Sequence, residues 1–179
     1  KQAYARPLGA LLDVLETLGA RITYHGEHGH LPFTIQGPLR DHPGTVTIDA
    51  SASSQFFSAM LLIAPLLGGA IIRSEQKLIS LPHINMTLDM MRATGITWSK
   101  LGTSEWKLEE GKPTASQIKI EADLSNAGPF LCAGILSGGS LAIPHWPVNS
   151  TQPGAMWPEL FERMGIETHF VATGSKNGT

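Results

Sequence analysis

Three neighbouring polar residues, Ser53, Ser54 and Gln55, come directly before a long apolar segment and could bind an anion. The apolar segment predicts a helix, so these side chains fall at its N-terminus. Backbone N–H groups in the first turn of a helix are unpaired, and the helix dipole places partial positive charge there. Side-chain hydroxyls added at this point would complete a site for a phosphate or a carboxylate.

The same residue types also cap helices, and spacing alone favours capping over ligand binding. Serine and aspartate are common just before a helix, where a side-chain oxygen accepts a hydrogen bond from a backbone N–H. Asp49 or Ser51 would be the cap of this helix. Asp123, followed by Ser125 and Asn126, repeats the pattern before a second apolar segment, and there too capping is favoured.

Two further groups stand at predicted helix starts. Ser80 precedes a helical segment in the order Ser-Leu-Pro-His, so it can cap that helix, and His83 falls in its first turn. Arg6 precedes Pro7 at the start of another helical segment, and a guanidinium pairs well with planar anions. Capping, packing or solvation are the alternatives for these three residues on pattern alone.

The segment His-Gly-Glu-His-Gly-His, residues 25–30, suggests metal binding but fits a hairpin turn better. Its spacing is loose, it has no cysteine partner, and its glycines favour a turn between two strands. The chain also has no P-loop, no G-x-S-x-G and no G-x-G-x-x-G after a strand. We therefore expect no metal and no cofactor.

Three segments share one layout of proline, helix-length stretch, glycine and short strand-like run. They extend from Pro7 to Gly19, Pro82 to Gly95 and Pro153 to Gly165, with spacings of 12, 13 and 12 residues. Proline suits the first turn of a helix, and a left-handed glycine suits its end. Pro158 would fall inside the third helix, which must therefore start late or kink. Strands are predicted at 20–24, 96–99 and 167–171.

A second repeated unit aligns residues 48–74 with 120–146. In this alignment Asp49 matches Asp123, and Gly68 matches Gly138. The helix predicted at 53–66 is apolar on every side, so it should be surrounded by protein. One complete repeat then has the order βαβαββ, which predicts an α/β (α+β) fold with mixed sheets and helices on one side. At least three copies are expected per globular body. The chain starts at Lys1 and opens into a helical pattern, so we expect it to be part of a longer protein.

Composition excludes several classes of function. The chain has 179 residues, of which 42% are hydrophobic and 16% charged, as in globular proteins. A net charge of −2 gives no basic surface for nucleic acid. The single cysteine, Cys132, cannot form an internal disulfide, which fits the cytoplasm. The apolar segment 56–72 is short for a membrane span and contains Pro65, so no membrane partner is expected.

Four segments together resemble the EPSP synthase (3-phosphoshikimate 1-carboxyvinyltransferase) family. They are DASASSQF, SLPHINMT, ARPLGALLDVLETLGA and EADLSNAGPFLCAGILSGG, and the resemblance runs from Arg6 to about Phe170. The histidine in SLPH and the sequence DLSN are similar to the actinobacterial branch. The resemblance implies an inside-out α/β barrel of two lobes, each built from three βαβαββ repeats. Residues 1–120 would belong to the inserted (N-terminal) lobe and 121–179 would begin the second (C-terminal) lobe.

The resemblance also implies an activity and its site. Enolpyruvyl is transferred from phosphoenolpyruvate to the 5-hydroxyl of shikimate 3-phosphate, a step of the shikimate pathway, by a monomeric cytoplasmic enzyme. Positions matching shikimate 3-phosphate ligands are Ser53, Ser54, Gln55, Ser80 and His83. Positions matching phosphoenolpyruvate ligands are Arg6 and Gln55. His83 stands where many members have tyrosine. No residue of this chain matches the family's acid–base groups, so we expect no turnover from the 179 residues alone.

Two alternatives remain open at this point. One is an enolpyruvyl transferase of the same fold that acts on UDP-N-acetylglucosamine, which should lack the paired SSQ and SxPH segments. The other is a non-catalytic binding or scaffold domain built from the same repeat.

Overall fold

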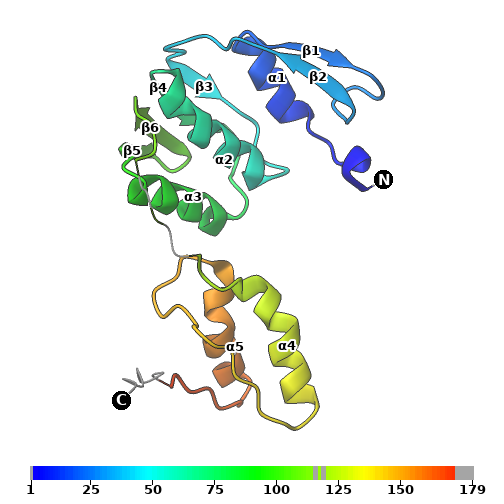
Figure 1. The fold of residues 1–179 in the computed structure, drawn as a ribbon, viewed down its shortest axis with the longest axis vertical. Coiled ribbons are helices and arrows are strands. Elements are labelled where there is room, and N and C mark those ends of the chain that lie inside the picture. Colours follow the sequence, from blue (N-terminus) through cyan, green and yellow to red (C-terminus); the bar gives the residue numbers. More distant parts are fainter. Residues whose placement is uncertain (1, 115–116, 118–119, 172–179) are drawn as a thin grey trace. The chain divides into compact units, whose positions relative to one another are not determined.

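The chain folds into two units, Lys1–Ile118 and Lys119–Thr179 (Figure 1). The computed structural model describes residues 2–114, 117 and 120–171. The assignment of residues 1–120 and 121–179 to two lobes stays a prediction.

A mixed four-stranded sheet forms the centre of the first unit. Its spatial order is β3-β4-β6-β5, with β3 and β4 parallel and the other neighbouring pairs antiparallel. One helix connects β3 to β4, and a second connects β4 to β5. The observed order confirms the predicted βαβαββ repeat. Its elements are β3 (Thr45–Thr47), α2 (Ser54–Ile63), the 3-10 turn η2 (Ala64–Leu67), β4 (Gly69–Arg73), α3 (Leu81–Ala93), β5 (Trp98–Gly102) and β6 (Glu105–Glu109).

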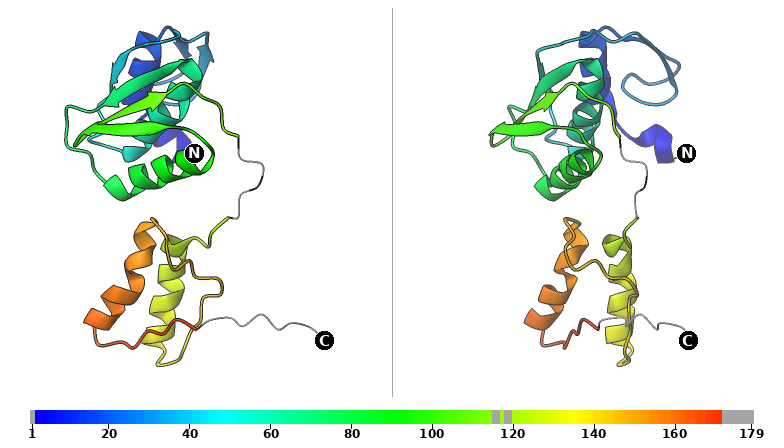
Figure 2. Two further views of the ribbon diagram at one scale, coloured as in Figure 1. Left: turned by 90° about the vertical axis from the view of Figure 1, so that its left-hand side faces the viewer. Right: turned by 60° about the vertical axis from the view of Figure 1, so that its left-hand side comes forward.

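The core of the first unit lies between this sheet and helices α2 and α3, which cover one of its faces (Figure 2). Phe57 of α2 meets Trp106 of β6 edge to face, with 5.4 Å between the ring centroids, and both side chains are buried. Burial of such a side chain contributes about 1.5–3 kcal/mol. The predicted all-round burial of α2 is not observed, because the sheet covers only one side of it. Leu62 and Leu66 stay 55% and 56% exposed.

An N-terminal segment adds a helix and a hairpin to the first unit. The 3-10 turn η1 (Gln2–Ala5) precedes α1 (Gly9–Thr17), which is followed by the antiparallel pair β1 (Arg21–Tyr24) and β2 (Phe33–Gln36). Val14 of α1 and Leu18 are buried in the same core as α2 and α3.

Glycines end the helices as predicted. Gly19, Gly95 and Gly165 have φ values of 105°, 87° and 81°, and Gly68 and Gly138 are also left-handed. Positive φ is unfavourable for any residue that has a Cβ atom, whereas glycine adopts it readily. The helix ends could therefore be located from the sequence.

The second unit contains α4 (Leu124–Leu136), the 3-10 turn η3 (Pro153–Met156) and α5 (Trp157–Arg163). Pro158 lies in the first turn of α5, so the third proline-to-glycine helix starts late. The Trp157 indole N–H donates to the Leu124 carbonyl at 3.0 Å and fastens α5 to α4. The strand predicted at 167–171 is wrong, because these residues form no strand. The described part of this unit offers no neighbouring strand with which to pair.

Candidate anion-binding site

The N-termini of α2 and α3 lie at the same end of the first unit (Figure 1). Each helix follows one of two parallel strands, β3 or β4, and therefore runs in the same direction as the other. The hydroxyls of Ser58 and Thr87 share a hydrogen bond of 2.9 Å across the helix pair. One turn nearer the two N-termini, on the same helix faces, stand Ser54 and His83. Two of the predicted residues thus come from different helices to one edge.

Ser53 is the N-cap of α2. Its backbone is extended, with φ −159° and ψ 125°, and its Oγ accepts a hydrogen bond of 3.2 Å from the Gln55 N–H. The prediction that Asp49 or Ser51 caps this helix is wrong. The Asp49 carboxylate accepts instead from the Ser51 N–H at 2.9 Å, and hydrogen bonds from Ser51 lower the pKa of Asp49.

Ser54 and Gln55 form the first turn of α2 with different exposure. Ser54 is 8% exposed and Gln55 is exposed. The Ser54 N–H makes no hydrogen bond within the part of the chain that the structure describes. An N–H donor with no protein partner at the positive end of a helix is what an anion requires.

The two repeated helices correct the alignment made from sequence. Asp123 caps α4 by accepting from the Asn126 N–H at 3.0 Å, as predicted. Fifteen positions separate Asp123 from the left-handed Gly138, and the same number separates Ser53 from Gly68. The structural counterpart of Asp123 is therefore Ser53 and not Asp49.

The first turn of α4 differs from that of α2 in one respect that the sequence did not reveal. The Leu124 N–H donates to the Gln152 side-chain oxygen at 3.0 Å. The Gln152 amide nitrogen in turn donates to the Glu121 carboxylate and the Ala122 carbonyl, both at 2.9 Å. The Gln152 side chain thus occupies the position at the N-terminus of α4 where an anion would otherwise bind. The 28-residue separation left no local signal for this contact.

Ser80 precedes α3 in a left-handed conformation, with φ 60° and ψ 52°. It occupies the N-cap position, but its side chain makes no capping hydrogen bond. The Ser80 hydroxyl is hydrogen-bonded to the His83 Nδ1 instead. The imidazole and the hydroxyl therefore form one polar pair at the start of α3.

Arg6 lies between η1 and α1, where its side chain is exposed. Its backbone N–H donates to the Ala3 carbonyl at 3.3 Å. Its guanidinium makes no hydrogen bond or ion pair with the residues that the structure describes. Its guanidinium is thus hydrogen-bonded to none of Ser53, Ser54 and Ser80.

Other features of the described residues yield no second candidate site. An open depression of about 540 Å³ at the ends of β4 and β5 is lined by Arg73, Ser74, Lys77, Leu81 and Glu105, and by none of the six predicted residues. Within residues 2–114, 117 and 120–171, no three His, Cys, Asp or Glu side chains form a group that could hold a metal. No helix in the described part of the chain is long and apolar enough to cross a membrane.

Comparisons with known proteins point in one direction. Residues 1–177 match the EPSP synthase (3-phosphoshikimate 1-carboxyvinyltransferase) family. The 3-phosphoshikimate 1-carboxyvinyltransferases of Bifidobacterium longum and Kocuria rhizophila are 44% and 39% identical over 97% of this chain. The chain spans about 40% of the length of these relatives. An EPSP synthase structure from Acinetobacter baumannii superposes with a TM-score of 0.65 at 24% identity, over 91% of this chain and 35% of that one.

Proposed function

Because the chain belongs to the EPSP synthase family, we propose that it forms part of a cytoplasmic enzyme that transfers enolpyruvyl from phosphoenolpyruvate to the 5-hydroxyl of shikimate 3-phosphate, with release of phosphate. The fold is part of the family's inside-out α/β architecture. The observation that carries the proposal is the polar edge made by the N-termini of α2 and α3, within a chain that matches the family along almost its whole length.

In this proposal the edge binds shikimate 3-phosphate. Ser53 and Ser54 meet its phosphate and hydroxyl groups, Gln55 touches both substrates, and the Ser80–His83 pair completes the site from α3. The first-turn N–H groups of α2 favour the dianionic phosphate. The hydroxyls of Ser53, Ser54 and Ser80 all stand at helix starts, so little reorganisation is needed when the ligand arrives.

Arg6 is proposed to bind phosphoenolpyruvate. Its exposed guanidinium, which has no partner among the described residues, is available for a carboxylate or phosphate. No acid–base group is assigned within this chain. The two lobes proposed for residues 1–120 and 121–179, and a monomeric full-length enzyme, belong to the same proposal.

Turnover by a full-length enzyme carrying this chain tests the proposal. Gln55→Ala and Arg6→Ala should each lower kcat/KM by about 100-fold, because they remove donors that face the reacting anions. Arg163→Ala is the matched control, since this exposed arginine pairs with Glu159 within α5 and belongs to no proposed binding group. Surface changes of this kind should alter kcat/KM by less than about twofold.

Calorimetry separates the competing functions. Binding of shikimate 3-phosphate that strengthens with phosphoenolpyruvate is the expected result. Binding of UDP-N-acetylglucosamine instead would indicate the other enolpyruvyl transferase class. A protein that binds none of these ligands would be a scaffold and would contradict the proposal.

A further inference from the structure

The histidine-rich loop, residues 25–32, is not a free hairpin turn. Its Gly29 is buried although its neighbour His28 is exposed. The Gly29 carbonyl accepts a hydrogen bond of 2.8 Å from the Leu8 N–H. Leu8 is the N-cap residue of α1, so the loop is attached to the point at which this helix begins.

The contact between loop and helix favours glycine at position 29. Its φ is +75°, a value that disfavours a residue with a side chain. A Cβ atom at this position would lie 3.3 Å from the Gly9 Cα, and backbone atoms cannot move aside cheaply. The two glycines therefore let the loop and the first turn of α1 approach closely.

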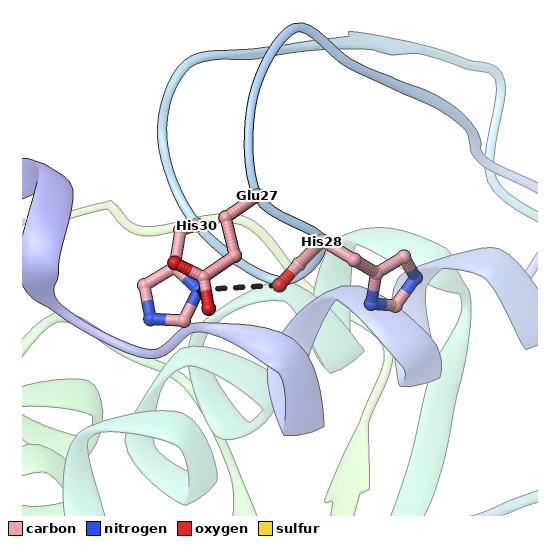
Figure 3. Close-up of polar contacts among 3 residues, drawn as sticks. All are labelled: Glu27, His28 and His30. Atoms are coloured by element: carbon pink, nitrogen blue, oxygen red, sulfur yellow. Dashed lines mark hydrogen bonds and ion pairs between the residues drawn. The ribbon is translucent and has the colours of Figure 1, made fainter.

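Hydrogen bonds within the loop hold Gly29 in place. The His30 N–H donates to the Glu27 carbonyl, and the His30 Nδ1–H donates to the His28 carbonyl, both at 3.1 Å. Figure 3 shows the Glu27 and His30 side chains turned toward each other, while the His28 ring turns away. The Glu27 Oε1 and the His30 Nδ1 are 4.0 Å apart. That ring packs on Tyr24 of β1, with 4.3 Å between centroids. These contacts within the loop hold the Gly29 carbonyl in the position where it accepts from the Leu8 N–H.

Arg6 lies two residues before this attachment. On its other side, its N–H donates to the carbonyl of Ala3, which lies within η1. Between Arg6 and Leu8 stands Pro7, whose ring fixes φ. Since the guanidinium has no partner among the described residues, the backbone attachments determine where Arg6 stands.

We propose that the loop of residues 25–32 is a positioning element for Arg6, which acts through the Gly29–Leu8 hydrogen bond and the Gly9–Gly29 contact. The inference rests on the proposed function, in which Arg6 binds phosphoenolpyruvate. In this proposal Gly29 itself contacts no substrate. Its effect is therefore on phosphoenolpyruvate alone.

Gly29→Ala in the full-length enzyme tests the proposal against Gly44→Ala. Gly44 has nearly the same φ, +74°, but open space where its Cβ would stand, so it reproduces the backbone strain without the displacement. Gly29→Ala should raise the KM for phosphoenolpyruvate about tenfold, because small misplacements of a binding group are costly. The KM for shikimate 3-phosphate should stay within about twofold in both variants. Equal changes in the two KM values, or the same split in Gly44→Ala, would overturn the proposal.

A second variant covers the case in which Gly29→Ala does not fold. Replacement of residues 26–32 by Asn-Gly-Thr closes the hairpin in a two-residue turn with a threonine opposite His25. Pro32 accepts from the His25 N–H at 2.9 Å but has no N–H to donate the hydrogen bond that closes such a turn, so it is replaced as well. This removes the attachment to Leu8 altogether. The same selective rise in the KM for phosphoenolpyruvate is expected, and an unchanged KM would overturn the proposal.

Amide hydrogen exchange at Leu8 separates failure of this inference from failure of the proposed function. Leu8 should be protected in the wild type and in Gly44→Ala, and should exchange faster in Gly29→Ala. A wild type that exchanges Leu8 freely overturns the attachment itself. A protected Leu8 in a protein that does not use phosphoenolpyruvate overturns the proposed function, and the role of Arg6 with it.

Discussion

The Ser58 and Thr87 hydroxyls meet at 2.9 Å and join helices α2 and α3 one turn behind the edge that carries Ser54 and His83. Thr87 also donates to the His83 carbonyl at 3.1 Å. On each of these two helix faces, a residue that joins the helices (Ser58 or Thr87) thus lies one turn from a residue of the proposed site (Ser54 or His83).

Thr87→Val should destabilise the protein by about 1 kcal/mol, because it removes one partner and leaves the half-buried Ser58 hydroxyl unpaired. The double variant Ser58→Ala with Thr87→Val should regain much of this loss, since neither helix then carries an unpaired hydroxyl there. Urea denaturation at constant m-value measures both changes. Additive losses in the double variant would mean that the two hydroxyls are not coupled.

Ser53→Asp should leave the stability of α2 unchanged but should weaken the binding of shikimate 3-phosphate. Aspartate caps helices at least as well as serine, and Asp123 already does so for α4. A carboxylate at this position should nevertheless repel the phosphate of shikimate 3-phosphate and weaken its binding more than about tenfold. Thermal unfolding and calorimetry report the two effects separately. Unchanged affinity would place the phosphate elsewhere.

Ser80→Gly and Ser80→Ala should differ in stability but not in binding. Both lose the hydroxyl that pairs with His83, so both should bind shikimate 3-phosphate less tightly by a similar factor. At φ 60°, glycine should be more stable than alanine by about 1 kcal/mol. Denaturant midpoints check the difference. If alanine were the more stable, the left-handed backbone of Ser80 would be contradicted.

The second unit should lose stability in acid through Glu121. Hydrogen bonds from Ser150 and Gln152 lower the pKa of Glu121 below its ordinary value of 4.5. A lowered folded-state pKa gives stability that is present above pH 4.5 and is lost as the pH falls through the folded pKa. Glu121→Gln should flatten this part of the pH profile, and Ser150→Ala should give an intermediate slope. Hydrogen exchange at the Leu124 amide, corrected for intrinsic exchange rates, gives the local free energy of opening at each pH and so measures this dependence.

Local patterns accounted for most of the fold. The apolar stripe of α3 is buried at Ile84, Leu88 and Met91, and the left-handed glycines stand where the spacing placed them. Helix period, helix start and helix end depend on residues a few positions apart, so the sequence carries them directly. The order βαβαββ followed from these elements.

Contacts between distant residues were the part that could not be predicted. The Gln152 side chain accepts from the Leu124 N–H although it lies 28 positions away, and no residue near Leu124 in the sequence indicates this contact. The strand predicted at 167–171 has the alternation of a strand, but a strand also needs a neighbour with which to pair. For the candidate site, the residue types were predicted, whereas the partnership of Ser80 with His83 required coordinates.

The cap was misassigned for a related reason. Asp49 and Asp123 look equivalent in sequence, yet Asp49 folds back on Ser51, and the chain continues to Ser53 before α2 begins. An aspartate that closes a turn and one that starts a helix have the same local signature.

The equal distance from cap to left-handed glycine in α2 and α4 makes the two segments candidates for recombination. Residues 53–68 and 123–138 start with a capping side chain, end in the same backbone conformation and have the same length. A chimaera that exchanged them would need no insertion or deletion. The polar groups of the first turn would then move between the units together, while β4, which follows residues 53–68, would keep its register.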